Sequence, residues 1–578
     1  MTNVSPATFL GSIKHRLEFL YGDEAEQCIK RLHMLFGRYE VLPIEEKPAP
    51  HWTEKDSILI TYGDTIKKEG EHPLQSLHTF AKERIGDAVS GIHILPFFPY
   101  SSDDGFSVID YRKVREDLGG WWQITDISKD YRLMADLVIN HVSQKSIWFK
   151  DYTKGIAPYS DFFIEEDPET DLSGVTRPRT SPLLTKVQTE TDDRYVWCTF
   201  SADQVDVDFS NPDVLFEYLD IIMFYISKGI TVIRLDAIAY LWKRVGTNCI
   251  HLPETHEVVK LIRDIFDVVA PHVTIITETN VPHDENVSYF GMGDEAHMIY
   301  QFSLPPLLLY TLLFQNATYL TRWAKNLESP PANCYYFNFL ASHDGVGVRP
   351  LEGLVPDEDF KALVDSIPEQ GGLVSKKANA DGSESPYELN ITYFSALADS
   401  ELVKEKYQIQ RFLCAHTIML TLQGVPGIYI HSMLATSNDH EGVKTKKYNR
   451  AINRRQWEYD ELNSLLDDEN TEHAQVFEAL KERLKIRSQQ PAFHPEAPQK
   501  IYSVDPAFFT VIRRSHDNTQ TILSVSNVTN EPQTLEKEKY ALPLNRYDSY
   551  ENLLGEDITA SKEPIILQPF ESIWLVIK

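Results

Sequence analysis

The 578-residue sequence predicts an α/β protein built on a (β/α)8 barrel with attached subdomains. Two observations carry this prediction. Short apolar runs alternate with helical patterns through the middle of the chain, which is typical of parallel βαβ units whose sheet is covered on both faces. Polar and charged residues fall repeatedly at the C-terminal ends of these runs, where a (β/α)8 barrel places its active site.

Six segments have the character of buried barrel strands. Each is a compact apolar run that ends in polar or charged residues, and a helix-like stretch separates most of them from the next. They cover residues 57–63, 91–99, 133–141, 230–240, 272–280 and 335–345. The predicted catalytic barrel comprises residues 51–141, 206–345 and 396–496.

The remaining segments do not follow the barrel pattern. Residues 1–50 show helical apolar spacing before a proline-containing connection, so we expect a helical N-terminal extension that caps the barrel or mediates a homodimer. Residues 142–205 and 346–395 are too long for simple loops and predict two inserted subdomains, which are usually functional. Residues 497–578 contain short β-like runs and predict a C-terminal β-sandwich-like domain.

Composition and charge exclude several functional classes. The chain carries 56 Lys and Arg against 85 Asp and Glu, a formal charge of −29, so the basic footprint of a nucleic-acid partner is missing. No apolar run reaches about 18 residues, so no membrane span is expected. The N-terminus lacks the pattern of a secretory signal. Five dispersed cysteines without a CxxC pair predict no metal site and a reducing, cytoplasmic location.

Carboxylates stand at the ends of four predicted strands. They are Asp103 in PYSSDDGFS, Asp236 in IRLDA, Glu278 in ITETN and Asp344 in ASHDG. A single one could be a helix cap or an ion-pair partner, but several at one barrel rim repel each other without a chemical reason to coexist. A retaining glycoside mechanism supplies that reason, because it needs a carboxylate nucleophile and a carboxylic acid about 5–5.5 Å apart.

The run TVIRLDAIAY, residues 231–240, suits the nucleophile. Arg234 leaves the strand on the same face as Asp236, and a neighbouring guanidinium lowers the pKa of a carboxyl. Glu278 follows an apolar strand, and a partly desolvated carboxyl of this kind suits the protonated acid.

The ordered motifs INHVS, IRLDA, TET and SHDG resemble the four signature motifs of the α-amylase superfamily. Longer stretches, among them GIHILPFFPYSSDDGFSVIDY, RPRTSPLLT and SPYELNITYF, are similar to its sucrose phosphorylase subfamily and to the glucosylglycerate phosphorylase branch of that subfamily. The resemblance covers about residues 50–578. It implies glucosyl transfer with retention through a β-glucosyl-enzyme, with no metal or organic cofactor.

The resemblance also implies roles for individual residues. Asp236 matches the nucleophile, Glu278 the general acid/base and Asp344 the transition-state stabiliser. The residues expected around the glucosyl ring are Asp103, Phe106, His141, Phe200, Gln204, Arg234, His343 and Arg454. The residues expected to meet phosphate or the acceptor are Arg177, Arg179, Lys186, Tyr387 and Glu388, of which Arg179 and Tyr387 match the family's phosphate-binding pair.

The carboxylates alone do not choose between water and phosphate as the second nucleophile. Phosphate is an anion and needs a local cation, preferably a forked guanidinium, which RPRTSPLLTK supplies. We therefore expect a phosphorylase whose partners are an α-glucoside and inorganic phosphate. A hydrolase or transglucosidase is the alternative. A non-catalytic scaffold should lack one of the three carboxylates, and all three are present.

The acceptor stays open at the level of sequence. Ser385 and Glu388 stand where sucrose phosphorylases usually show aspartate and glutamine, and ETN stands where they read EVH. These departures favour the glucosylglycerate branch, in which a basic pocket would suit glycerate. Lys186 would equally suit fructose 6-phosphate, which needs charge-assisted contacts. Sucrose, with fructose as the acceptor, and glycerol remain further alternatives.

Overall fold

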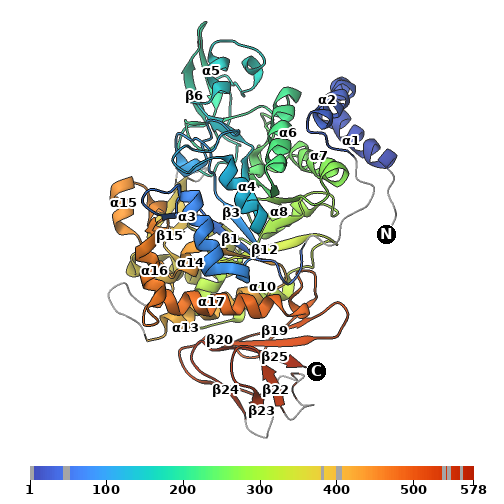
Figure 1. Cartoon of the computed structure of the whole chain (residues 1–578). Helices are drawn as coiled ribbons and strands as arrows, with labels where there is room; N and C mark the ends of the chain where they lie inside the picture. The colour runs from blue at the N-terminus through green and yellow to red at the C-terminus, as the bar shows by residue number, and fades with distance from the viewer. Residues whose placement is uncertain are drawn as a thin grey trace.

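The structure is a computed structural model that describes residues 6–42, 52–378, 383–398, 406–536, 542, 544, 549–559 and 564–577. Eight parallel strands close into a barrel in the order β1-β16-β12-β11-β10-β9-β4-β3, which confirms the predicted (β/α)8 fold (Figure 1). These strands are β1 (Ile58–Thr61), β3 (Gly91–Ile94), β4 (Arg132–Val138), β9 (Ile230–Asp236), β10 (Thr274–Thr277), β11 (Met298–Tyr300), β12 (Tyr335–Phe339) and β16 (Val425–Tyr429).

Two barrel strands, β11 and β16, are not predicted by the sequence pattern. β11 has only three residues, and β16 reads VPGIY, in which proline and glycine argue against a central strand. A Cβ atom on Gly427 would lie 2.4 Å from the Phe337 ring, so the pairing of β16 with β12 requires glycine here. Side-chain packing across the barrel, rather than periodicity, therefore selects this strand.

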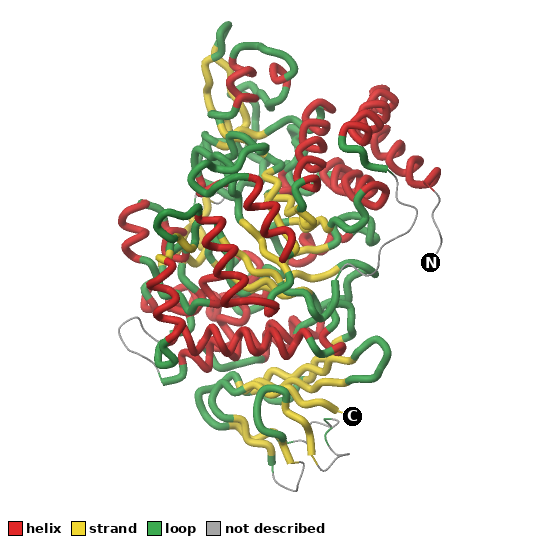
Figure 2. Tube along the Cα trace, in the orientation of Figure 1, coloured by secondary structure: helices red, strands yellow, loops and turns green. Residues whose placement is uncertain are grey.

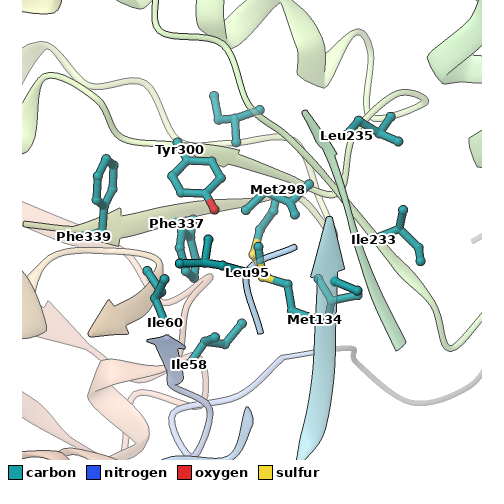
Figure 3. Close-up of a cluster of buried hydrophobic side chains, with 14 of the residues drawn as sticks. Ile58, Ile60, Leu95, Met134, Ile233, Leu235, Met298, Tyr300, Phe337 and Phe339 are labelled. Carbon is teal, nitrogen blue, oxygen red and sulfur yellow. The ribbon is translucent and has the colours of Figure 1, made fainter. Parts of the chain in front are cut away.

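Apolar side chains fill the interior of the barrel. Figure 3 shows Ile58, Met134, Met298 and Phe337 pointing toward one another from different strands. All four are at most 1% exposed. Burying a side chain of this size contributes about 1.5–3 kcal/mol. The packing of this apolar layer fixes the positions of the strands, and the strands in turn position the charged residues at their ends.

Helices surround the barrel (Figure 2). The longer ones are α3 (Pro73–Phe80), α4 (Trp121–Asp130), α6 (Pro212–Ser227), α7 (Pro253–Val269), α9 (Leu304–Leu313), α10 (Thr318–Asn326), α13 (Gln408–Thr421), α16 (Tyr459–Asp467) and α17 (Glu472–Ser488). Shorter elements are α8 (His283–Val287), α12 (Tyr393–Ala396), α14 (Ile430–Met433), α15 (His440–Lys446) and the pair β2 (Ile66–Lys67) and β17 (Trp457–Glu458). No helix of the described residues is long and apolar enough to cross a membrane.

The N-terminal helices α1 (Pro6–Tyr21) and α2 (Ala25–Arg38) pack against the outside of the barrel beside α7 and α6 (Figure 1). Arg16 donates to Asp264 at 2.5 Å and to Glu257 at 3.0 Å, both on α7. The Tyr21 hydroxyl donates to the Phe209 carbonyl at 3.0 Å. The extension thus covers the flank of the barrel, while its role in a homodimer stays a prediction.

Two insertions follow barrel strands, and a β domain follows α17. The first insertion holds β5 (His141–Ser143), α5 (Ile147–Thr153), β6 (Leu184–Gln188), β7 (Asp193–Trp197) and β8 (Gln204–Asp206). The second holds β13 (Val346–Gly347), α11 (Asp357–Ser366), β14 (Leu373–Ala378) and β15 (Glu384–Asn390). In Figure 1 the α5–β6 region and the C-terminal domain lie at opposite ends of the molecule. The exact domain boundaries stay predictions.

The C-terminal domain is built of β-strands, as predicted, and these strands pair antiparallel. Its larger sheet is β18 (Gln499–Tyr502), β19 (Phe508–Arg514), β20 (Thr521–Asn527), β25 (Ser572–Ile577), β22 (Ser549–Asn552) and β23 (Ile558–Thr559). A second sheet pairs β21 (Gln533–Leu535) with β24 (Ile565–Leu567). The larger sheet packs against α13, away from the inserted α5–β6 region.

Candidate active site

Two of the predicted catalytic carboxyls lie side by side at the ends of β9 and β10. Asp236 is the last residue of β9, and Glu278 follows β10 with its backbone N–H donating to the Leu235 carbonyl at 3.1 Å. Ala237 adopts a left-handed φ of 56° directly after Asp236, and its N–H donates to Glu278 Oε2 at 3.2 Å. A non-glycine residue in this region is strained, and such strain clusters at functional sites.

Arg234 lies beneath the carboxyls rather than on the cavity wall. Its guanidinium is 3% exposed, and Nη1 donates to Asp236 Oδ1 at 2.6 Å. The same nitrogen also donates to Asp136, which faces Arg234 in the register of β4 and β9. Nε donates to the Tyr300 hydroxyl at 3.2 Å. The simple Arg234–Asp236 pair expected from sequence is therefore a shared site in which one guanidinium serves two carboxylates.

This crowding perturbs the three carboxyls differently. Burial raises the pKa of Asp236, and the charges of Glu278 and Asp136 add to that shift while Arg234 opposes it. Burial also raises the pKa of Glu278. Although burial opposes it, Arg234 with His93 lowers the pKa of Asp136 to about 2. Asp136 therefore balances the guanidinium charge, and the Asp236–Glu278 pair is suited to holding one proton between them.

The contacts favour one location for that proton. Asp236 receives a charge-assisted bond from Arg234 at 2.6 Å, whereas Glu278 Oε2 lies 4.0 Å from the nearest guanidinium nitrogen. The direct bond stabilises the ionised form. The geometry therefore leaves the negative charge on Asp236 and the proton on Glu278, which is the division of roles that a retaining mechanism needs.

Asp344, which follows β12, is held by an arginine that the sequence does not single out. Arg450 Nη1 lies 2.5 Å from Asp344 Oδ1, and Arg454 Nη2 lies 3.8 Å from the same atom. Arg450 also donates to both oxygens of Glu388, at 2.9 and 2.7 Å. Its position four residues before Arg454 in YNRAINRR is the signal that could have identified it.

Glu388 is predicted to meet phosphate or the acceptor, and that role stays a prediction; in the structure its side chain is bonded to protein donors. The side chain is 4% exposed, and Oε1 also accepts from the Gly345 N–H at 2.9 Å. Both of its oxygens therefore face protein donors. Glu388 also belongs to the cavity wall, where its bonds orient Arg450, the arginine that reaches Asp344.

The next part of the wall joins the PYSSDDGFS loop to Arg454. Asp103 and Asp104 both adopt left-handed φ values, 55° and 46°. Arg454 Nη1 donates to Asp104 at 2.7 Å, and the Tyr448 hydroxyl donates to the same carboxylate. Gln204 Nε2 donates to Asp103 at 3.2 Å. The strained turn thus points the two adjacent carboxylates toward different partners.

Aromatic and imidazole rings form the remaining predicted wall. His343 stacks on Phe106 with centroids 4.7 Å apart and ring planes at 8°. His141 Nε2 donates to the Phe106 carbonyl at 2.9 Å, and its ring centroid lies 5.0 Å from that of Phe200. Burial lowers the pKa of His141, and burial with the charges of Arg454 and Arg234 lowers that of His343. Both imidazoles are therefore neutral near pH 7.

A cavity of about 670 Å³ opens beside these groups. It is lined by Arg179, Phe200 and Tyr387, together with Glu388 and Arg450. The Arg179 guanidinium lies 5.7 Å from the Phe200 ring centroid and 6.0 Å from that of Tyr387. Among the described residues no carboxylate is paired with Arg179, so its charge remains available to an anion.

Arg177 and Lys186, the other two predicted basic residues of this loop, do not line the cavity. Arg177 Nε and Nη2 are buried without a hydrogen-bond partner among the described residues, and burial lowers the pKa of this guanidinium. Lys186 lies on β6 opposite Tyr195 of β7, and its Nζ is 2.7 Å from Asp193. The hairpin directs Lys186 to solvent. The structure therefore brings Arg179, but not Lys186, to the cavity wall.

One trio of side chains in the described part of the chain resembles a metal-ligand set. Ligand atoms of His494, Glu496 and His516 lie within 4.8 Å of one another, near the start of the C-terminal domain. His494 Nδ1 already accepts from the Glu496 N–H at 3.2 Å. The trio lies outside the cavity described above and contributes none of the side chains that line it.

Comparison with known proteins agrees with this geometry. Residues 85–347 match the α-amylase catalytic-domain family. A glucosylglycerate phosphorylase of Spirochaeta thermophila is 46% identical over 89% of both chains. One of Allomeiothermus silvanus is 42% identical over 100% of both. The chain belongs to the α-amylase superfamily. The crystal structure of a sucrose 6F-phosphate phosphorylase from Thermoanaerobacter thermosaccharolyticum superimposes with a TM-score of 0.72 at 25% identity, covering 89% of this chain and 98% of the other.

Within the α-amylase superfamily, the chain is a glycoside phosphorylase of the sucrose phosphorylase type. The predicted family and enzyme class are therefore confirmed. Residues that the sequence pattern does not single out include Asp136, Arg450 and Tyr300. Asp136 carries the same signal as Arg234, a charge inside an apolar run, in LMADLVIN.

Proposed function

We propose that this phosphorylase transfers glucose from glucosylglycerate to inorganic phosphate, giving α-glucose 1-phosphate and glycerate. The observation that supports phosphorolysis is the Arg179 guanidinium, which lies on the wall of the cavity and has no carboxylate partner among the described residues. A forked cation is the group that a phosphate dianion needs inside a protein with 85 acidic residues. Similarity over nearly the whole chain to glucosylglycerate phosphorylases supports the donor.

In the first half-reaction Asp236 attacks the anomeric carbon while Glu278 gives its proton to the glycosidic oxygen. The bond from carbon to the Asp236 oxygen forms, the glycosidic bond breaks, and glycerate leaves with the proton. Asp344 accepts hydrogen bonds from glucosyl hydroxyls, and bonds of this kind strengthen in the transition state. Burial of Glu278 supports its role, because it raises the pKa of the acid.

In the second half-reaction phosphate takes the place of glycerate. Glu278, now ionised, removes a proton from the phosphate, and a phosphate oxygen attacks the anomeric carbon as the bond to Asp236 breaks. Two inversions give net retention. Arg179 and Tyr387 hold the anion in this proposal. Burial raises the pKa of Tyr387 although Arg179 opposes it, so the hydroxyl is a neutral donor to phosphate near pH 7.

The decisive experiment compares phosphorolysis with hydrolysis. The wild type should release glucose 1-phosphate from glucosylglycerate only when phosphate is present. Arg179→Ala should lower kcat/KM for phosphate on the order of 100-fold, because a charge-assisted contact contributes up to about 3 kcal/mol. Hydrolysis of α-glucosyl fluoride should change only a few-fold, and Asp236→Ala should abolish both reactions. Equal glucose release with and without phosphate would contradict the phosphorylase proposal.

A further inference from the structure

Most arginines near the catalytic carboxyls are already neutralised. Arg234 binds Asp136 and Asp236, Arg450 binds Asp344 and Glu388, and Arg454 binds Asp104. Arg349 is different. Its side chain is half-buried, and within the described residues no ion pair or side-chain hydrogen bond engages it. An unpaired cation withdrawn from water is costly, which calls for a ligand that pairs with it.

The backbone around Arg349 lies between the acid strand and the phosphate side of the cavity. Arg349 follows β13, and the preceding Val348 N–H donates to the Tyr387 carbonyl at 3.1 Å. On the other side, a Cβ atom on Gly347 would lie 2.8 Å from the Asn280 amide nitrogen. Asn280 is two residues beyond Glu278. The segment 347–349 therefore bridges the general acid and Tyr387.

Tyr240 lies within electrostatic range of both Arg349 and Arg179. Burial raises the pKa of Tyr240, and the charges of Tyr387 and Glu278 add to the shift, while Arg349 and Arg179 oppose it. Tyr240 packs edge-on against Phe200, which lines the cavity, with centroids 5.5 Å apart. Two guanidinium groups from different insertions therefore lie on the Tyr240 side of the site, Arg179 on the cavity wall and Arg349 behind the residues that line it.

An unpaired acceptor atom accompanies the unpaired cation. Asn280 Oδ1 is buried and has no hydrogen-bond partner within the described residues. A buried amide oxygen without a donor loses about 1–3 kcal/mol. A ligand that carries both a carboxylate and a hydroxyl would satisfy the cation and the amide oxygen together.

We propose that Arg349 binds the carboxylate of the acceptor and that Asn280 accepts a hydrogen bond from one of its hydroxyls. Arg349 thereby selects small hydroxycarboxylates over neutral polyols, while Arg179 serves phosphate. This assignment rests on the proposed function, because that function supplies an acceptor with one carboxylate. The assignment also gives phosphate and the acceptor carboxylate separate binding groups, because Arg179 and Arg349 come from different insertions.

The test runs the reaction in the synthetic direction, from α-glucose 1-phosphate, with glycerate, lactate, fructose 6-phosphate or glycerol as the acceptor. Arg349→Gln should raise the KM for glycerate about 10- to 100-fold, the loss of one charge-assisted contact. The KM for glycerol and the KM for phosphate in phosphorolysis should change less than about twofold. Arg349→Lys, which keeps the charge but loses the fork, should fall between Arg349→Gln and the wild type.

Arg322→Gln is the matched control. Arg322 lies on α10 over the Tyr319 ring, and its substitution removes the same charge at a different place in the fold. Thermal unfolding of each variant checks that it folds. An Arg349→Gln variant with an unchanged KM for glycerate, or with equal losses for glycerate and glycerol, would overturn the Arg349 assignment alone. A wild type that uses fructose 6-phosphate instead of glycerate would overturn the proposed donor, and a wild type restricted to glycerol would overturn both.

Discussion

The arginines on the glucosyl side of the site differ from those on the proposed acceptor side in whether they are paired with carboxylates. On the glucosyl side, Arg234, Arg450 and Arg454 each bind at least one carboxylate at 2.7 Å or less. On the proposed acceptor side, Arg179 faces two aromatic rings, and the Arg349 side chain has no ion-pair or hydrogen-bond partner within the described residues. The same residue type is therefore paired with carboxylates in one region and, among the described residues, has no carboxylate partner in the other.

This contrast follows from what each side has to bind. A glucosyl ring is neutral, so its binding groups must be held in a fixed orientation, and paired hydrogen-bonded networks provide that rigidity. Glycerate and phosphate are anions that must enter and leave a protein of net charge −29. A guanidinium group that has no carboxylate partner among the described residues adds local positive charge, which favours the approach of an anion.

On the glucosyl side, the substitution Glu278→Gln should cause the largest loss of activity. Burial raises the pKa of Glu278 above its usual value, so the acid stays protonated as the pH rises and loses its proton only above that range. Wild-type phosphorolysis should therefore decline on the alkaline side. Glu278→Gln should lower kcat for glucosylglycerate by about 10²- to 10⁴-fold.

Donors with different leaving groups separate this role from a structural one. Fluoride leaves without a proton, so α-glucosyl fluoride should be used by Glu278→Gln with a much smaller loss in the glucosylation step, measured as single-turnover fluoride release. The alkaline limb of that profile should also disappear. A variant that kept the wild-type alkaline limb would show that another group donates the proton.

The next effect concerns Glu388, which is bonded to Arg450 on the glucosyl side. Glu388→Gln keeps an oxygen for the Gly345 N–H but removes the charge that holds Arg450. Arg450 should then orient Asp344 less well, and kcat for every donor should fall about 10-fold, because a hydrogen bond to a charged group contributes about 1.5–3 kcal/mol. The KM for glycerate should stay within about twofold. A selective rise in that KM would instead return Glu388 to the acceptor side.

The sequence predicts the glucosyl side, where the arginines are paired with carboxylates, better than the acceptor side, and the reason is physical. Asp236 is the last residue of β9, Glu278 directly follows β10, and Asp344 lies in the loop that follows β12. A short apolar run fixes both the strand and the place where it ends. Arg450 and Asp136 escape the prediction because their roles depend on which strands and loops become neighbours. The pairing of Asp136 with Arg234 is set by the register of β4 against β9, which no local pattern encodes.

The barrel itself shows the same limit. Six of its strands follow from apolar runs, whereas β16 contains Pro426 and Gly427, and the Phe337 ring leaves no room for a side chain at Gly427. On the acceptor side, Arg179 and Lys186 belong to the same stretch of sequence, RPRTSPLLTK. The β6–β7 hairpin separates them, because it pairs Lys186 with Asp193 at the surface. Spacing along a loop does not predict such a divergence.

Lys186→Ala should have the smallest effect on activity. It tests whether the cations that meet an anion include a residue of the β6–β7 hairpin. Lys186 and Asp193 are 55% and 53% exposed, and an exposed ion pair of this kind contributes about 0–1 kcal/mol to stability. Its loss should leave the KM for phosphate, and that for glycerate, within about twofold of the wild type. Steady-state kinetics beside Arg179→Ala would measure this. A tenfold rise in either KM would mean that Lys186 reaches the anion during turnover, and the free cations would then extend from the cavity wall along the first insertion.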